Sequence, residues 1–286
     1  MRIMLGYNGS EASKAAIYDL HNAGLKDDTE ALVYTTAEEW NYPHNNEEAR
    51  QVADEGVSSL QREFPQWTVT GETAAGSPPR EILARAQDFN PDLIVVGEPR
   101  HNLDEHNLFV GHTSHVLLTE AECSIRIARG DKQSESRPQR IMVGFDGSAG
   151  SKLSVETIAG RRWNAGTCVE LLAVADSSVL GLIGRFNPAM QGAAIEVKFA
   201  SQWAETLASR SLAKLNEAGI SSSVEVLLGH PKDVIIEKAQ RNYVDTIFVG
   251  PDSSSNSFER FLIGSVSASV AARAHCSVEV VRRPHA

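Results

Sequence analysis

The amino-acid sequence contains two copies of one unit, and this repetition constrains the fold more than any other feature. The segment RIMLGYNGSEASKAA begins at Arg2 and returns at Arg140 as RIMVGFDGSAGSKLS, so that equivalent positions differ by 138 in number. Farther along the chain the offset becomes 153 and relates Gly76 to Gly229, Gly97 to Gly250, Gly111 to Gly264 and Cys123 to Cys276. Internal repetition of this kind predicts two homologous structural units. We therefore expect domains at residues 1–129 and 140–286, joined by a solvated linker at 130–139.

Each repeat alternates short apolar runs with amphipathic stretches, a pattern typical of a parallel sheet covered by helices. The expected strands of the first repeat are residues 2–7, 31–36, 67–73, 93–96 and 124–128. The expected helices begin near residue 10 and span about 47–63, 78–88 and 111–118. The second repeat follows the same order. The sequence thus predicts an α/β fold with two tandem, doubly wound domains, each built on a five-stranded parallel sheet.

The change of offset from 138 to 153 means that the second repeat contains a net insertion. We assign it to the segment around 176–192, after the second predicted strand. Its apolar side chains are unusual for a freely solvated loop: Val179, Leu180, Leu182, Ile183 and Phe186. We expect residues 178–190 to form a lid or a surface for a protein partner, with packing onto their own domain as the alternative.

Charge and composition exclude several classes of function. The chain has 27 basic and 37 acidic side chains, a net charge of −10, which argues against nucleic-acid and anionic-membrane partners. No apolar run is long enough for a membrane span and no signal-peptide pattern is present, so we expect a cytoplasmic protein. Three cysteines without a CxxC pair predict reduced, mostly buried thiols rather than a disulfide framework.

The charge is distributed unevenly between the repeats. Residues 1–130 carry 10 basic and 21 acidic side chains, whereas residues 131–286 carry 17 basic and 16 acidic ones. A polyanionic ligand therefore meets less long-range repulsion near the second repeat.

Ligands of doubly wound sheets bind beyond the carboxyl ends of the strands, so residues that follow strands are the candidate site. The first strand of each repeat is followed by Asn8-Gly-Ser or Asp146-Gly-Ser. The fourth strand is followed by a long loop that ends in a glycine at a helix start, Gly111 or Gly264. Backbone N–H groups and the positive end of the helix dipole favour an anion there.

Four motifs occur together in the second repeat: a strand ending in Asp-Gly-Ser, a Gly-x-Pro helix start, an Asp-x-Ile-x-x-Gly strand end, and a closing Gly-Ser-Val-Ser helix before a cysteine and an apolar strand. In this combination the chain resembles the universal stress protein family in its tandem form, over essentially its whole length. The resemblance implies an adenine nucleotide alpha hydrolase-like fold arranged as a pseudo-dimer. It also implies a stress-response or regulatory protein that binds an adenine nucleotide, ATP with Mg.

The resemblance assigns nucleotide-binding residues in the second repeat: Asp146 at the base, Val174 at the adenine edge, and Gly250, Gly264, Ser265 and Val266 around the phosphates. The chain departs from the family loop G-x2-G-x9-G-[ST], because the stretch between Gly250 and Gly264 is longer by one position than the family pattern. The middle glycine is replaced within the run Ser253-SSNS, where Ser254 can supply a hydroxyl donor. Alternatively, the Asp146 side chain could only stabilise the turn in which it lies, by a hydrogen bond to the backbone.

The first repeat departs further from the family pattern. Asn8 replaces the aspartate, Arg100 and His101 occupy the region of the middle glycine, and His112 replaces the serine after Gly111. We therefore expect ATP in the second repeat only.

Histidines also gather in the first repeat, and they offer an alternative chemistry. His101, His106, His112 and His115 follow one another closely in the sequence, and the last two have an i, i+3 spacing that can serve one metal ion. No CxxC or HExxH motif supports a metal site. An acidic solvated loop with incidental histidines is the simpler interpretation.

No catalytic motif accompanies the candidate nucleotide site. The chain lacks a G-x4-GK[ST] loop, a GxGxxG after a strand and a GxSxG elbow. We therefore expect a binding or switch protein rather than an enzyme, with a slow ATPase or a nucleotide-free interaction module as alternatives.

The resemblance implies that the final strand of each repeat lies at the edge of its own sheet, and an exposed apolar edge strand is prone to aggregation unless it is covered. Antiparallel pairing of residues 124–129 with 277–282 would cover both edges within one chain, as a monomeric pseudo-dimer, although a homodimer remains possible. Arg126 and Glu279 occupy equivalent positions with opposite charges. We expect them to form an exposed cross-strand pair worth about 0.2 to 1 kcal/mol.

Overall fold

The computed structural model describes residues 1–37, 45–99, 110–130, 138–175, 193–251 and 263–283. The first repeat contains β1 (Arg2–Gly6), α1 (Glu11–Asp19), the short 3-10 helix η1 (Leu20–Asn22), β2 (Glu30–Ala37), α2 (Asn45–Glu63), β3 (Thr68–Ala75), α3 (Pro78–Phe89), β4 (Leu93–Gly97), α4 (His112–Glu120) and β5 (Ser124–Ala128). The second contains β6 (Arg140–Gly144), α5 (Ala149–Ala159), β7 (Cys168–Ala175), α7 (Ala193–Glu217), β8 (Ser221–Leu228), α8 (Pro231–Arg241), β9 (Thr246–Val249), α9 (Ser265–Arg273) and β10 (Ser277–Val280).

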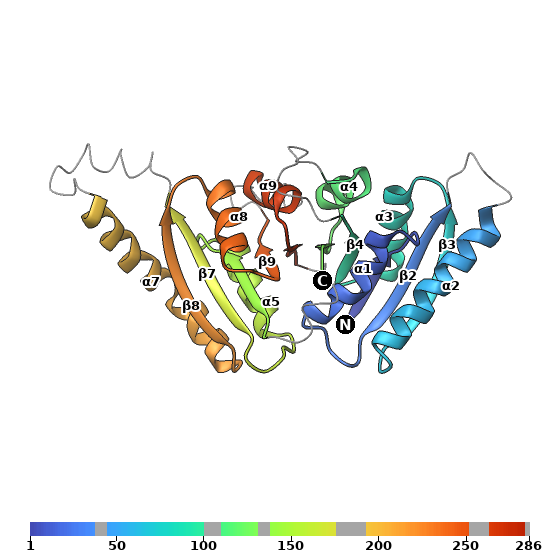
Figure 1. The fold of residues 1–286 in the computed structure, drawn as a ribbon, viewed down its shortest axis with the longest axis horizontal. Coiled ribbons are helices and arrows are strands. Elements are labelled where there is room, and N and C mark those ends of the chain that lie inside the picture. Colours follow the sequence, from blue (N-terminus) through green and yellow to red (C-terminus); the bar gives the residue numbers. More distant parts are fainter. Residues whose placement is uncertain (38–44, 100–109, 131–137, 176–192, 252–262, 284–286) are drawn as a thin grey trace.

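The ten strands of the described residues form one continuous sheet in the order β3-β2-β1-β4-β5-β10-β9-β6-β7-β8 (Figure 1). Strands pair in parallel within each repeat, and β5 pairs with β10 antiparallel. At this junction Arg126 lies opposite Glu279. The structure thus confirms the predicted α/β fold and the pairing of the two final strands.

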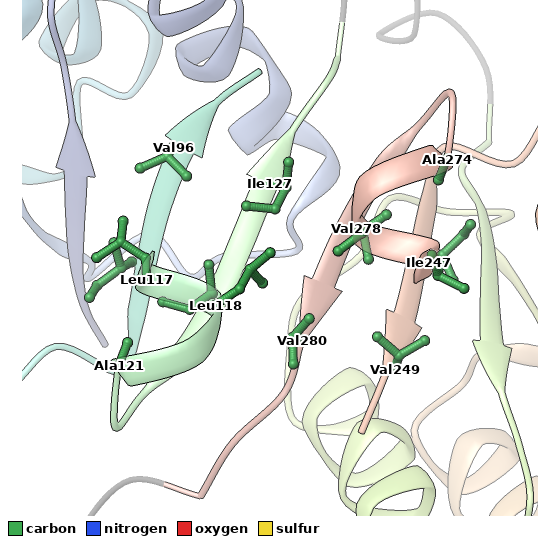
Figure 2. Close-up of a cluster of buried hydrophobic side chains, with 14 of the residues drawn as sticks. Val96, Leu117, Leu118, Ala121, Ile127, Ile247, Val249, Ala274, Val278 and Val280 are labelled. Carbon is green, nitrogen blue, oxygen red and sulfur yellow. The ribbon is translucent and has the colours of Figure 1, made fainter. Parts of the chain in front are cut away.

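Helices cover both faces of the sheet. On one face, α3, α4, α8 and α9 cover a hydrophobic core that continues from one repeat into the other. Figure 2 shows this core around the junction, with Ile127 of β5 beside Val278 and Val280 of β10. On the opposite face, α1 and α2 cover one core and α5 and α7 another. Burial of apolar side chains on one face therefore joins the repeats directly.

Short sequence signals bring helix starts to the carboxyl ends of the strands. Ser10 and Ser148 cap α1 and α5, each side chain accepting a hydrogen bond from a backbone N–H three residues later at 3.2 Å. The helices α3 and α8 each begin with proline two residues after a glycine, at Gly76 with φ 145° and at Gly229 with φ 143°. These left-handed values favour glycine.

One local expectation needs correction. The end of the linker is not solvated, because Gln139 is buried and its amide donates to the His21 carbonyl at 2.8 Å. The segment assigned to the insertion, residues 176–192, lies outside the described part of the chain. The cysteines agree with the prediction of mostly buried thiols: Cys123 and Cys276 are buried, and burial raises the pKa of each thiol to about 12, while Cys168 is exposed.

The residue after the C-cap of α8 has a strained backbone. Tyr243 has φ 51° and is 72% exposed, while the equivalent Asn90 has φ 49°. Asparagine tolerates this left-handed conformation better than tyrosine does. We expect Tyr243→Asn to raise the free energy of unfolding by about 0.5 to 1 kcal/mol. Urea unfolding would test this, and an unchanged or lower midpoint would contradict it.

Candidate functional site

A cavity of ≈ 230 Å³ lies at the carboxyl ends of β6, β7 and β9. Its walls come from strand ends (Gly144, Phe145, Asp146, Leu172, Val174, Val249, Gly250, Pro251), from helix starts near β6 and β8 (Ser148, Ser151, Pro231, Ile235), and from the start of α9 (Gly264, Ser265, Val266, Ser267). This is the crevice in which a doubly wound sheet binds its ligand.

All the predicted nucleotide-binding residues that the structure describes line this one cavity: Asp146, Val174, Gly250, Gly264, Ser265 and Val266. They come from four separate segments of the chain. Ser254 lies outside the described residues. The fold therefore brings together residues that the sequence analysis assigned by resemblance.

On the apolar side of the cavity, the sequence analysis assigned only Val174. Leu172 and Ile235 belong to the hydrophobic core and also line the cavity beside Val174. Pro231 lines it as well, although the Gly-x-Pro motif was interpreted only as a helix start. Two sequence patterns could have identified these residues. Alternate side chains of β7 point to the same face of the sheet, and apolar residues recur at helical spacing in α8.

The start of α9 offers backbone donors to this cavity. Its N-cap is Gly264, which has no side chain that could accept a hydrogen bond from the first turn. The first hydrogen bond of the helix runs from the Ala268 N–H to the Gly264 carbonyl at 2.9 Å. The N–H groups of the first turn therefore have no acceptor within the helix. The Ser267 hydroxyl donates to the Gly250 carbonyl at 2.7 Å and ties α9 to the end of β9.

Gly250 is required by the packing of the strand end. A Cβ placed there would lie 2.3 Å from the carbonyl carbon of Gly150, in the first turn of α5. A Cβ at the equivalent Gly97 would lie 2.1 Å from the Ala12 carbonyl oxygen. Both glycines thus let a helix start approach the sheet closely, and this structural role is common to the two repeats.

Asp146 has a turn role that Asn8 shares. An Oδ1 atom accepts from the Ser148 N–H at 2.9 Å in one case and from the Ser10 N–H at 3.2 Å in the other. The two side chains differ at the remaining atom, which is a carboxylate oxygen in Asp146 and an amide NH₂ in Asn8. Only Asp146 offers a second acceptor to a ligand's hydroxyl or amino group.

In the first repeat a carboxylate of the chain itself lies at the start of α4. Glu98 occupies the position equivalent to Pro251, and its Oε1 accepts hydrogen bonds from the Gly111 N–H at 3.0 Å and from the Ser114 hydroxyl. Gly111 and Ser114 are the counterparts of Gly264 and Ser267. A second anion at this helix start would be repelled by Glu98.

The first repeat also carries a larger side chain in the crevice. Tyr34 stands where the second repeat has Leu172, since each pairs with the last glycine of its repeat's first strand. Tyr34 is buried, and burial together with Glu81 and Glu72 raises its pKa. Glu98 and Tyr34 are therefore two structural differences between the repeats that the motif comparison did not reveal.

The histidine cluster is only partly described. His112 and His115 lie in the first turn of α4, and His101 and His106 lie outside the described residues. Among the residues that the structure describes, no group of three or more His, Cys, Asp or Glu side chains is arranged to hold a metal ion. Over the same residues, no helix is long and apolar enough to cross a membrane.

Comparison with known proteins supplies the family. The model of the universal stress protein family matches residues 1–129 and again 138–282. A universal stress protein of Methanocaldococcus jannaschii is 38% identical over 68 residues, which is 24% of this chain and only 39% of that protein's length.

Two solved structures resemble the whole chain in fold. A universal stress protein from Archaeoglobus fulgidus has a TM-score of 0.65 at 18% identity, over 99% of this chain and 96% of that one. A functionally unknown protein from Pseudomonas aeruginosa has a TM-score of 0.62 at 15% identity, over 99% and 92%. With the family model matching both repeats, this chain belongs to the universal stress protein family.

Proposed function

We propose that the second repeat binds an adenine nucleotide, ATP with Mg²⁺, and that the protein acts as a nucleotide-dependent regulator in the stress response. The observation that carries this proposal is one cavity that combines an apolar wall with the N-terminus of α9. An adenine ring suits the wall at Val174 and Leu172, and phosphates suit the N–H groups of Ser265 and Val266. Asp146 would accept from the base or the ribose.

Magnesium fits this arrangement as a partner of the phosphates. Mg²⁺ prefers oxygen ligands and commonly binds nucleotide phosphates with only one or two protein carboxylates. Asp146 is the carboxylate that lines the described part of the cavity. Because we place Asp146 at the base or the ribose, we assign no protein ligand to the ion.

A slow ATPase and a nucleotide-free module are the two alternatives. The described lining includes no histidine, no lysine and no second carboxylate that could serve as a general base. We therefore expect binding without rapid hydrolysis. Calorimetric titration should give one ATP per chain, and a phosphate-release assay should show turnover far below that of dedicated ATPases. An absence of binding would favour the module, and rapid release would favour the enzyme.

Gly264→Asp is expected to abolish ATP binding while preserving the fold. Aspartate is a favourable N-cap residue, so α9 should still begin at the same place. Its carboxylate would lie where the phosphates are proposed to bind and would repel them. Calorimetry on the variant and on the wild-type protein measures the change.

Gly264→Asn is the matched control, because it has nearly the same shape without the charge. It should retain more affinity than Gly264→Asp. Gly111→Asp is a poor control, since a Cβ there would lie 2.9 Å from Glu98 Oε1. Equal loss in both Gly264 variants would indicate steric blocking, and unchanged affinity in Gly264→Asp would place the phosphates elsewhere.

Asp146→Asn is expected to weaken ATP binding about tenfold, equivalent to ~1.4 kcal/mol. The free energy of unfolding should stay the same, because Asn8 shows that an amide oxygen can make the same turn bond. Asn8→Asp should leave ATP affinity unaffected. If Asp146→Asn binds ATP as tightly as the wild type, Asp146 serves only its turn.

A further inference from the structure

Each repeat holds the end of the other repeat's last helix with a buried arginine. Arg129 follows β5, and its Nη2 donates to the Ala271 carbonyl in the last turn of α9 at 2.7 Å. Arg282 follows β10, and its guanidinium donates to the carbonyls of Ala121, at 2.6 Å, and Leu118 at the end of α4. The two arginines occupy equivalent positions of the two repeats, and both are almost fully buried.

The junction of the sheet fixes the backbone of both arginines. The Arg129 N–H donates to Ser277 Oγ at 2.8 Å, and the Arg282 N–H donates to Ser124 Oγ at 3.0 Å. These serines belong to the partner strands β10 and β5. Each arginine therefore reaches the opposite helix only because the two final strands pair.

A cation at this position suits a helix C-terminus. The last carbonyls of a helix have no intrahelical donor and carry a partial negative charge. A buried arginine satisfies such a carbonyl, and its removal leaves the carbonyl without that donor in a site that excludes water. The contact thus holds the last turn of each helix against the junction.

The two contacts differ in what lies at the other end of the helix. Helix α9 has nine residues and is about 13.5 Å long, so its C-terminal contact lies close to its first turn in the cavity. At the start of α4, in contrast, the Glu98 carboxylate accepts a hydrogen bond from the Gly111 N–H. Figure 1 shows the two helices on the same side of the sheet near the junction. A short helix moves as a unit, so a shift at Ala271 would displace the N–H groups at Ser265 and Val266.

We propose that Arg129 of the first repeat is a positioning residue for the nucleotide site of the second repeat. This inference rests on the proposed function of that site. The first repeat then contributes to ATP binding through the hydrogen bond from Arg129 to the C-terminal turn of α9. By linkage, ATP should in turn strengthen the docking of the repeats by the same factor.

The test compares Arg129→Met with Arg282→Met in the full chain. Each variant loses an equivalent contact to a helix C-terminus, so both should lower the melting temperature to a similar extent. ATP affinity should fall about fivefold or more in Arg129→Met and less than twofold in Arg282→Met. Arg129→Lys should restore part of the affinity, because it retains a donor, and it replaces Arg129→Met if that variant does not fold.

A merely structural role would shift both melting temperatures and leave ATP affinity alike in the two variants, which would overturn the proposal. If the wild-type protein binds no ATP, the proposed function fails, and amide hydrogen exchange then decides the inference. Exchange at Ala268, in the N-terminal half of α9, should accelerate in Arg129→Met and not in Arg282→Met. Unchanged exchange there would overturn the positioning role.

Discussion

Arg126→Met is expected to lower the free energy of unfolding by about 3 to 5 kcal/mol, because it leaves the buried carboxylate of Asp19 without its cation. Arg126 lies at the junction of the sheet, with its Nε 2.6 Å from Asp19 Oδ2 and its Nη1 3.5 Å from Glu279 Oε2. All three side chains have 0% exposure. Urea unfolding of variant and wild type measures the difference.

Arg162→Met is the control for this prediction. Arg162 pairs with Asp27 across the same two repeats, but the two side chains are 70% and 67% exposed. An exposed pair contributes little, so this change should cost less than about 1 kcal/mol. If Arg126→Met costs no more than Arg162→Met, the buried pairs do not support the junction.

The structure corrects the sequence-based expectation for this pair. Arg126 and Glu279 were expected to form an exposed cross-strand pair, and they are opposite each other as predicted but fully buried. Asp19 also binds Arg126, and Arg161 also binds Glu279. Reversing both charges would place a carboxylate beside Asp19 and a cation beside Arg161. The double reversal should therefore not recover stability, contrary to the simple pair model.

The charge pattern also explains why the two repeats pair with each other. Within the first repeat, Arg126 of β5 is bound by Asp19 of α1; within the second, Glu279 of β10 is bound by Arg161. Two copies of either repeat would bring like charges together at the junction, which costs energy in a buried site. Opposite polarity in the two repeats makes their mutual pairing the favoured one.

The repeated pattern was sufficient to predict the strands and the helices, because each depends on local periodicity or on equivalence between copies. The antiparallel junction also needed the family resemblance, which placed each final strand at a sheet edge. The candidate cavity was predictable for residues next to strand ends and glycines, such as Asp146 and Gly264. Leu172 and Ile235 were not predicted, since an apolar residue in a strand or helix serves the core by default. The same limit applies to polar residues whose partners are distant in sequence.

Glu98, Arg129 and Arg282 illustrate that limit. Glu98 meets Ser114, Arg129 meets Ala271, and Arg282 meets Ala121. Each contact depends on a loop path or on the sheet junction, which no local pattern specifies. In sequence, the two arginines look like ordinary charged ends of strands, and only the paired sheet makes them buried contacts between the repeats.

Pro251→Glu is expected to weaken ATP binding by at least about 100-fold. The substitution gives the second repeat a glutamate at the position equivalent to Glu98. The Glu98 carboxylate accepts a hydrogen bond from the start of α4. The new carboxylate should bind the Ser267 hydroxyl and the N-terminus of α9 in the same way. A charge about 4 Å from a phosphate oxygen costs roughly 4 kcal/mol at an effective dielectric constant near 20. Calorimetry would measure the lost affinity.

Pro251→Gln controls for the loss of proline and for side-chain size. It should bind ATP clearly more tightly than Pro251→Glu, since glutamine cannot act as a competing anion. Both variants should unfold at similar urea concentrations, because a carboxylate at a helix N-terminus is itself mildly stabilising. If Pro251→Glu retains wild-type affinity while folded, the start of α9 is not where the phosphates bind, and Glu98 does not explain the difference between the repeats.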